Sequence, residues 1–415
     1  MTSRFFYGWT AIVPAAGLML LVTNGLTLGG IAAFDPTLVE VLDAPRAAIK
    51  FGDTLQLAAA AVLTVVAGAL ADRYGYRGVM LAGLAALVWG FYSLADVATI
   101  GEYYRARLWM GVGLAGAGMA ICIVAVSRWF VTRRGLAVGL VLAGSSIGNG
   151  FMPKIFTELI AADGWRTAAL YGAAVLAFLP LLVWLLLREW PHSIGLKAHG
   201  ADRVAAATQA DAAGPQLSYR QILARRDFWL LGVAAFGTFY AILGVNNNMI
   251  LHMQDLGAPP SIGALIAIPL FLAGVVSKVG AGWLTDLLGR KPVWLICLAL
   301  MLTGVLLLCA MRVEWVAAGA LLLGLGWGAN YTLLQALAGD LFGARSLGKV
   351  MGALTVLDAA GGALGPWLTA RIADTTGDYQ LSFGLVAALI GCALLAGARL
   401  RIVTPDLLAR RSAAG

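Results

Sequence analysis

Three ionisable side chains lie inside long apolar segments of the 415-residue sequence: Lys278, Asp358 and Lys154. An ammonium group in such a place can bind an anion, and a carboxyl group can take up a proton. On insertion scales, each group costs about 2.5 to 3.5 kcal/mol at the centre of a membrane helix. We therefore expect the three side chains to face an internal cavity or one another.

Lys278 and Asp358 are predicted to lie at the same depth. Lys278 precedes Asp286 by eight residues, which is roughly 12 Å along a helix. Asp358 follows Lys349 by nine residues, which is roughly 13 Å. Both positions are near the middle of a hydrocarbon core about 30 Å thick, and Lys154 is about 15 Å from the opposite face by the same rise. The two opposite charges are expected to face each other.

The elements that must position these residues are membrane spans. In this sequence, 60% of the residues are hydrophobic and 12% are charged, about half the charged share of a soluble domain. Twelve apolar segments of roughly 20 residues are each long enough to cross the hydrocarbon. They are 9–33, 51–71, 78–97, 103–126, 135–160, 167–187, 228–251, 262–285, 292–311, 314–338, 347–372 and 381–400. The sequence therefore predicts an all-α membrane protein.

The net charge of +8 does not indicate a nucleic-acid partner. Most of the 29 Lys and Arg residues fall in alternate loops, as the positive-inside rule describes. This pattern predicts that both termini are cytoplasmic. We also expect the chain to lie in the cell inner (plasma) membrane, with the lipid bilayer as its partner. The other loops mix acidic and basic residues, among them Asp35, Arg46, Lys50 and Asp53.

Catalytic and metal-binding patterns are not found. The four Cys residues, Cys122, Cys297, Cys309 and Cys392, all fall inside apolar segments, where a thiol behaves as a small apolar group. No nucleophile with an adjacent His, no metal-ligand cluster and no phosphate loop is present. We expect no enzyme activity, metal or cofactor, and we expect His252 to be a solvated loop residue.

The chain divides into two halves with the same pattern. We expect a six-helix bundle at 1–187, a cytoplasmic linker at 188–227 and a second six-helix bundle at 228–415. GALADRYGYRG (68–78) follows the second apolar segment and GWLTDLLGRKP (282–292) follows the eighth. Both read G-x-L-x-D-x-x-G-x-[RK]. Repeats of this kind are typical of secondary transporters, whose substrate site lies near the midplane between the repeats.

The repeat also tests whether the fold itself needs the three charges. It aligns Lys278 with Thr64, Asp358 with Ser145 and Lys154 with Trp367. Because the other half lacks the charge in each case, a substrate or proton site explains the charges better than a structural need. Two alternatives stay open: Lys278 can extend toward the cytoplasm, or it can form a static pair with Asp358.

Two six-helix halves, a long middle linker and GALADRYGYRG resemble the major facilitator superfamily. FYGWTAIV in the first segment, SRWFVTRRGLAVGL between the fourth and fifth, and GWR after the fifth are similar to bacterial carriers of the monocarboxylate and oxalate/formate type. The resemblance implies two pseudo-symmetric bundles that work by alternating access. It also implies a cytoplasmic charge gate that stabilises the outward-open state, formed by Asp72, Arg73, Arg77, Asp286, Arg290 and Lys291. The alternative is that these charges only set the topology.

The resemblance gives Lys278 and Asp358 roles. The family pattern R-x-x-x-G-x-x-x-[DN] matches Lys278, Gly282 and Asp286, and the cation at its first position binds the substrate carboxylate. In the oxalate/formate pattern a second cation stands six residues after the position of Gly352, where this chain has Asp358. This departure fits a monoanion better than a dianion, with Asp358 taking up the coupled proton.

Further polar residues are predicted to contribute to the site. Asn246 and Tyr331 are expected to add hydrogen-bonding groups from the seventh and tenth segments. Lys154 is expected to be either a second substrate cation or a gate charge that pairs with Asp35 or Asp53.

The function expected from these residues is transport of a small organic anion. We expect proton-coupled symport of a monocarboxylate such as lactate or pyruvate, carried out by a monomer. The alternative is a proton-driven exporter of a hydrophobic or cationic compound, with Asp358 as the cation receptor and Lys278 as its resting partner. Replacement of Lys278 by alanine separates the two, because it should abolish only anion binding.

Overall fold

The fold is a bundle of membrane-length helices. The structure is a computed structural model that describes residues 6–200 and 217–400. Within these ranges, 12 helices or runs of helices are long and apolar enough to cross a membrane, and the β-type pairing is limited to one bridge between Phe130 and His199. The predicted all-α membrane class is therefore confirmed.

The first half contains six spans. The first span joins η1 (Gly8–Ile12), α1 (Val13–Asn24), η2 (Gly25–Gly29), η3 (Gly30–Phe34) and α2 (Asp35–Val41). The next five are α3 (Arg46–Tyr74), α4 (Tyr76–Ala95), α5 with α6 (Ile100–Ala117 and Met119–Trp129), α7 (Arg134–Asp163) and α8 (Trp165–Leu186). A short helix, η4 (Pro191–Ile194), follows α8.

The second half repeats this arrangement after the short helix α10 (Tyr219–Leu223). Its spans are α11 (Arg226–Asp255), α12 with α13 (Pro260–Leu265 and Ala267–Leu288), α14 (Arg290–Leu308), α15 (Val313–Phe342), α16 (Ala344–Thr376) and α17 (Gln380–Arg399). The domain limits 1–187, 188–227 and 228–415 stay a prediction, because residues 201–216 and 401–415 lie outside the described ranges.

The repeated loop motif has the same backbone form in both halves. Its second glycine is Gly75 between α3 and α4 and Gly289 between α13 and α14, with φ of +93° and +83°. A side chain is strained at such a φ, so glycine allows the chain to leave one span and enter the next at once. The internal repeat read from the sequence is therefore also a repeat of local structure.

The first span is not a continuous α-helix. Its middle contains the π-helical turn η2, which is followed by the 3₁₀ turn η3. A π-helical turn changes the backbone hydrogen bonding, and the carbonyl of Thr27 in η2 accepts a hydrogen bond from Gln56 Nε2 of α3 at 3.0 Å. Gly25 packs so closely on Gly148 of α7 that a Cβ there would lie 2.8 Å from the Gly148 Cα. The glycines thus let the first span lie against α7.

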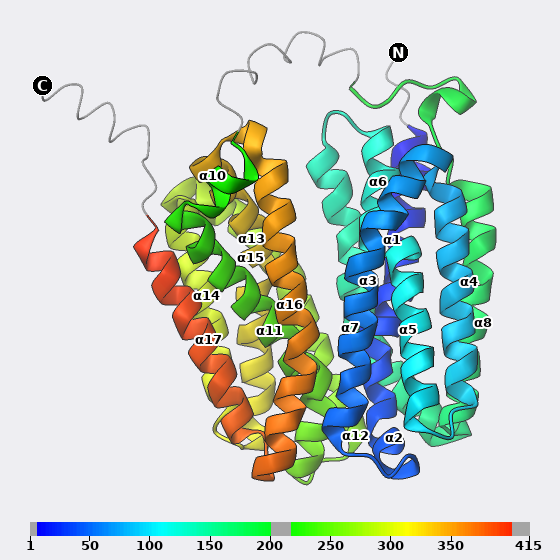
Figure 1. Cartoon of the computed structure of the whole chain (residues 1–415), viewed down its shortest axis with the longest axis vertical. Helices are drawn as coiled ribbons and strands as arrows, with labels where there is room; N and C mark the ends of the chain where they lie inside the picture. Colours follow the sequence, from blue (N-terminus) through cyan, green and yellow to red (C-terminus); the bar gives the residue numbers. More distant parts are fainter. Residues whose placement is uncertain (1–5, 201–216, 401–415) are drawn as a thin grey trace, which may run out of the picture.

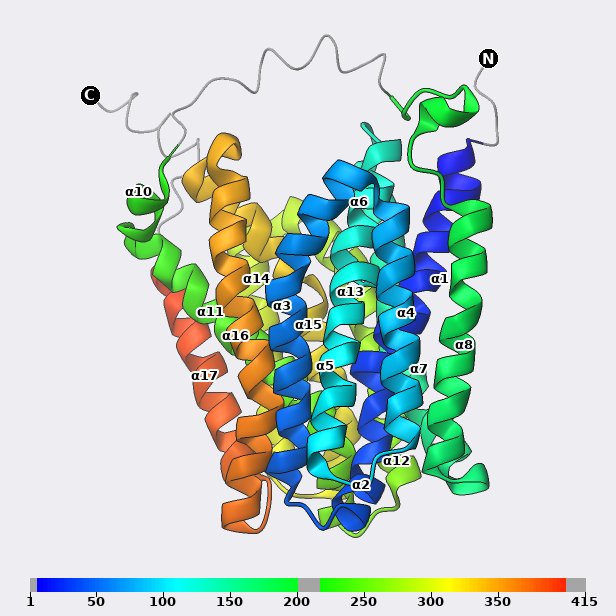
Figure 2. The same cartoon turned by 45° about the vertical axis from the view of Figure 1, so that its right-hand side comes forward.

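The two halves meet mainly along two pairs of spans. One buried apolar cluster belongs mainly to α1–α8, and two others belong to α11–α17. Across the interface, α16 packs against α3 and α13 packs against α7. Figures 1 and 2 show α10 and η4 at one end of the molecule and α2 and α12 at the other. We name these the α10 end and the α2/α12 end.

Candidate functional site

Lys278 lies on α13 at the interface between the halves. Its ammonium group donates a hydrogen bond to Ser146 Oγ of α7 at 3.1 Å, and it lies 5.5 Å from the ring centroid of Trp327 on α15. Both partners are uncharged, and the side chain is half-buried. Lys278 is thus a cation that reaches the opposite half without a carboxylate partner among the described residues.

Asp358 lies on α16 and is almost completely buried, with 4% of its surface exposed. Its Oδ1 accepts no hydrogen bond from the described residues. No ion pair joins it to Lys278 in this conformation, so the facing pair expected from the sequence is not formed. The position of a residue along its helix predicts its depth in the membrane, but it does not predict the side of the helix on which the side chain lies. The Lys278 side chain extends toward Ser146 and not toward Asp358.

The other predicted site residues have mixed environments. Tyr331 on α15 meets Phe239 edge-on, with ring centroids 6.1 Å apart, and it is close enough to Asp358 for an electrostatic interaction. Asn246 on α11 is buried and donates to Asn247 Oδ1 at 3.1 Å. Their roles in binding stay a prediction.

Lys154 forms a local ion pair. Its ammonium group lies 2.7 Å from Glu158 Oε1, one turn later on α7, and 63% of the Glu158 side chain is exposed. The pairs with Asp35 or Asp53 that the sequence left open are not formed. The pair joins two residues one helical turn apart on α7 and does not connect the two halves.

His252 is not the solvated loop residue that was expected. Helix α11 continues to Asp255, and His252 is fully buried against the rings of Tyr379 and Phe383. Neither ring nitrogen has a hydrogen-bond partner among the described residues. The prediction was wrong because the apolar segment ends at residue 251, whereas the helix extends one turn further.

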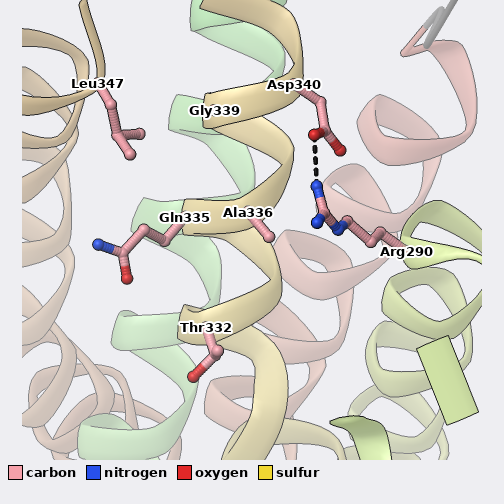
Figure 3. A pocket seen from close by; sticks show the side chains of 7 residues that line it. All are labelled: Arg290, Thr332, Gln335, Ala336, Gly339, Asp340 and Leu347. Atoms are coloured by element: carbon pink, nitrogen blue, oxygen red, sulfur yellow. Dashed lines mark hydrogen bonds and ion pairs between the residues drawn. The ribbon is translucent and has the colours of Figure 1, made fainter. Parts of the chain in front are cut away.

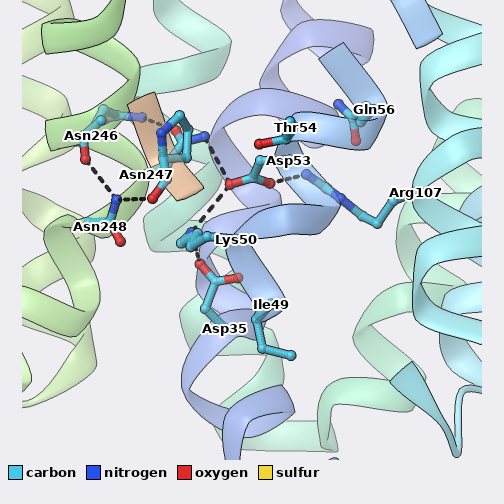
Figure 4. A network of polar contacts seen from close by, with 12 residues as sticks. Asp35, Ile49, Lys50, Asp53, Thr54, Gln56, Arg107, Asn246, Asn247 and Asn248 are labelled. Carbon is cyan, nitrogen blue, oxygen red and sulfur yellow. Dashed lines mark hydrogen bonds and ion pairs between the residues drawn. The ribbon is translucent and has the colours of Figure 1, made fainter. Parts of the chain in front are cut away.

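The sequence missed a buried network of charges near the α2/α12 end. Lys50 pairs with Asp35 and lies 3.5 Å from Asp53, and Arg107 of α5 also pairs with Asp53. All four side chains are at most 3% exposed. Figure 4 shows that Asn247 of the other half completes the network, with its Nδ2 3.3 Å from Asp53 Oδ2.

Asp35, Lys50 and Asp53 were expected in a mixed-charge loop, and this expectation was wrong. Helix α3 begins at Arg46, so Lys50 and Asp53 lie within its first turns and not before it. Arg107 lies near the start of the predicted segment 103–126. A charge at that position is usually close to the membrane edge and exposed to water. A signal was present, because Asp53 and Arg107 both fall inside the segments 51–71 and 103–126 and carry opposite charges.

The two halves are joined at the α2/α12 end by a clamp of polar contacts. Arg46 makes two hydrogen bonds to Asp255, of 2.6 and 2.5 Å, and it also lies 5.7 Å from the ring centroid of Tyr379. The Ala47 N–H donates to Asp374 at 2.8 Å. A bidentate hydrogen bond between Arg and a carboxylate is strong and has a defined geometry. Because this one joins the two halves, the clamp stabilises the closed form of the α2/α12 end.

Replacement of Arg46 with alanine should open the α2/α12 end more often. Hydrogen bonds to charged groups contribute about 1.5 to 3 kcal/mol, and partial exposure places this pair at the lower limit, so we expect a shift of roughly tenfold in the open-to-closed ratio. Spin labels at Val41 of α2 and Ile262 of α12 report the distance between the halves. Arg105→Ala is the control, because Arg105 pairs within its own half, with Glu102. An unchanged distance distribution in Arg46→Ala would contradict the clamp.

At the α10 end, all of the predicted gate charges except Asp286 contact residues of their own halves. Asp72 is 81% exposed and lies 3.8 Å from Arg128. The remaining contacts are Arg73 over the Tyr74 ring, Arg77 with the Trp184 carbonyl, Arg290 with Asp340, and Lys291 with the Ala398 and Leu400 carbonyls. Asp286 has no ion pair within the described ranges. No gate is assembled across the halves in this conformation, and its role stays a prediction.

A hollow of about 450 Å³ lies beside one of these pairs. Figure 3 shows Arg290 and Asp340 at its side. It is also lined by Thr332, Gln335, Ala336, Gly339 and Leu347. Its walls come from α14, α15 and α16 of the second half, so this hollow is not the interface that contains Lys278.

Comparison with known families decides the identity of this fold. A family model for the Major Facilitator Superfamily matches residues 6–268 and 235–414. The chain belongs to the major facilitator superfamily. Within that family it is a multi-pass membrane transporter and not an enzyme, as the sequence led us to expect.

Curated members of the superfamily resemble the chain over most of its length. Monocarboxylate transporter 13 of Bos taurus is 26% identical over 96% of this chain and 89% of its own. Monocarboxylate transporter 11 of Homo sapiens is 28% identical over 92% and 81%. The 4-hydroxybenzoate transporter PcaK of Pseudomonas putida is 26% identical over 68% and 66%.

A solved superfamily structure has the same fold. A bacterial homologue of the human lysosomal transporter Spinster, in an inward-facing and unoccupied conformation, matches with a TM-score of 0.74. The match covers 96% of this chain and 98% of that one at 14% identity. This likeness supports the twelve-span architecture.

Proposed function

We propose that this chain is a secondary transporter that moves a small monocarboxylate together with a proton by alternating access. One observation carries the proposal: Lys278 presents an ammonium group at the interface of the halves, and its described partners, Ser146 and Trp327, are uncharged. A cation in a membrane is costly unless a charge or dipole compensates it. A substrate carboxylate would supply that compensation, and a single cation suits a monoanion.

The relatives support this substrate class. Two of them are monocarboxylate transporters, and a third transports 4-hydroxybenzoate, which is also a monocarboxylate. Because their sequence identity to this chain is low, they do not indicate which monocarboxylate it transports. Lactate and pyruvate are the acids expected from the sequence, and they belong in any panel of test substrates.

The conformation supports alternating access. If the positive-inside pattern places the α10 end in the cytoplasm, the clamp of Arg46 and Asp255 closes the outer side. The structure then corresponds to an inward-facing state. In the opposite state, Asp72, Arg73, Arg77, Asp286 and Arg290 would exchange partners across the halves and form the cytoplasmic gate.

The remaining site residues have supporting roles in this proposal. Tyr331 and Asn246 would offer hydrogen bonds to the substrate. Lys154 would join the site only after it leaves Glu158. Since one chain contains both halves, we propose that a monomer in the inner (plasma) membrane, with cytoplasmic termini, is sufficient.

Uptake into liposomes tests the proposal. The purified protein is reconstituted, and labelled lactate, pyruvate, benzoate and oxalate are offered with and without a pH gradient, alkaline inside. We expect monocarboxylates to accumulate when the gradient is imposed and oxalate to be excluded. Equal accumulation with and without the pH gradient would contradict proton coupling. A failure to transport any monocarboxylate would contradict the proposal as a whole.

Replacement of Asp358 with asparagine should separate exchange from coupling. Asp358 is buried and one of its oxygens has no partner, so it can take up a proton in the membrane interior, whereas asparagine cannot. We expect exchange of labelled for unlabelled acid to continue, while accumulation driven by the pH gradient falls at least tenfold. Asp163→Asn is the control, because Asp163 is an exposed carboxylate that binds the Tyr171 hydroxyl. Undiminished accumulation in Asp358→Asn would exclude this residue as the coupling site.

A second candidate function is favoured by the same unpartnered oxygen of Asp358. A buried carboxylate can receive a cation, which suits a proton-driven exporter of a hydrophobic or cationic compound. The two candidates differ in their need for Lys278. Export of a cation should survive its replacement by alanine, whereas anion transport should not.

A further inference from the structure

An aromatic surface on α15 connects the environments of Lys278 and Asp358. Trp327 lies beneath the Lys278 ammonium group, and Tyr331 follows one helical turn later, close to Asp358. Residues four apart lie on the same face of a helix. Phe239 of α11 extends this face, because its ring meets Tyr331 edge-on.

This surface belongs to the interior of the protein and not to the lipid boundary. It is met by Lys278 of α13, Phe239 of α11 and Asp358 of α16, so three helices of its own half surround it. Ser146 of the other half reaches Lys278 at its edge. Trp327, Tyr331 and Phe239 are nevertheless only half-buried, so part of each side chain stays accessible.

The spacing suits a ring. Four residues of helix rise about 6 Å, so Trp327 and Tyr331 together form an aromatic face long enough for one six-membered ring beside the Lys278 ammonium group. The ammonium group has three N–H donors, and Ser146 uses one of them. A carboxylate can therefore bind Lys278 while the body of the acid extends along the two aromatic side chains.

We infer that the site selects aryl monocarboxylates, whose flat ring lies against Trp327 and Tyr331 while the carboxylate binds Lys278. This inference rests on the proposed function. A small aliphatic acid such as lactate would satisfy Lys278 but leave the aromatic surface uncovered. Contact between aromatic rings adds roughly two- to tenfold in affinity beyond the area that it buries.

Competition measurements on the reconstituted full chain test the inference. Benzoate, cyclohexanecarboxylate and lactate compete for uptake of labelled benzoate. Cyclohexanecarboxylate has the size of benzoate without the flat aromatic ring. We expect benzoate to bind about tenfold more tightly than lactate and several-fold more tightly than cyclohexanecarboxylate. Equal affinities for benzoate and either other acid would overturn the inference.

Variants of the aromatic surface give a second measurement. In Trp327→Leu we expect benzoate affinity to fall about tenfold and lactate affinity to fall less than threefold. Tyr331→Phe keeps the ring and should retain the preference. Trp315→Leu is the matched control, because Trp315 is an exposed tryptophan near the start of the same helix. An equal loss for both acids in Trp327→Leu would overturn the inference.

The outcomes distinguish this inference from the proposed function. If benzoate and lactate are transported equally well and Lys278→Ala abolishes both, the anion carrier stands and the aryl preference is wrong. If no monocarboxylate is transported, or if Lys278→Ala transports them normally, the proposed function and the aryl preference fail together.

Discussion

Lys278→Ala should lose anion binding almost completely. The ammonium group is the charge that compensates the substrate carboxylate in this proposal, and its described contacts are with neutral groups. Hydrogen bonds to charged groups contribute about 1.5 to 3 kcal/mol, which corresponds to a loss of roughly 10- to 100-fold in affinity. An unpaired carboxylate at the interface would add a desolvation cost. Binding of labelled benzoate and lactate to the purified protein measures the effect.

Two further lysine variants make this test specific. Lys278→Arg should retain binding, because a guanidinium group keeps the charge and can bind a carboxylate with two hydrogen bonds. Lys154→Ala should change affinity less than twofold if Lys154 stays paired with Glu158 while the substrate binds. Normal binding by Lys278→Ala would reject the anion carrier and favour the exporter. A large loss in Lys154→Ala would identify Lys154 as the second cation that the sequence left open.

Asp53→Ala should have the largest effect on stability. Asp53 pairs with Lys50 and Arg107 and also accepts a hydrogen bond from Asn247 of the other half. Its loss leaves two buried cations with Asp35 as their remaining carboxylate in the network. Removal of one partner from a buried ion pair costs about 3 to 5 kcal/mol. We expect a lower unfolding temperature and faster thermal unfolding in detergent.

Cys122 in the same half is buried, whereas Cys309 and Cys392 are partly or fully exposed. In a background where Cys297, Cys309 and Cys392 are replaced with alanine, a thiol-reactive dye reaches Cys122 only after unfolding and so measures unfolding directly. Asp96→Ala is the control, because Asp96 is exposed at the end of α4. In the double variant Asp53→Asn, Arg107→Gln, one charge of each sign is removed, so it should lose less stability than the two single variants together. A fully stable Asp53→Ala would contradict the network.

Comparison of sequence and structure shows which physical signals could be read in advance. Lys278 and Asp358 could be recognised because a charge in an apolar segment is energetically costly. The turns at Gly75 and Gly289 could be recognised because the loop motif is repeated. These signals are local and depend on composition and spacing. The partner of Lys278, in contrast, is Ser146 on a helix of the other half, and no local pattern specifies which faces of distant helices meet.

The missed residues share another cause. Asp53, Arg107 and His252 lie near the ends of apolar segments, where hydropathy cannot separate a loop from the first or last turn of a helix. The helices α3 and α11 extend beyond the apolar segments, and the interface between the halves covers their ends. Burial at these ends comes from tertiary contacts, so an exposed loop was the natural but wrong expectation.

The buried network has an electrical consequence. Its two carboxylates, Asp35 and Asp53, balance its two cations, Lys50 and Arg107. A membrane voltage does about 2.3 kcal/mol of work per 100 mV on each net charge that crosses it, but it does no work on a neutral group that moves without turning. When the halves rock, the voltage therefore acts on this network only through its dipole and not through a net charge. A monoanion that travels with one proton also carries no net charge, so the substrate gradient and the pH gradient alone would drive such a cycle.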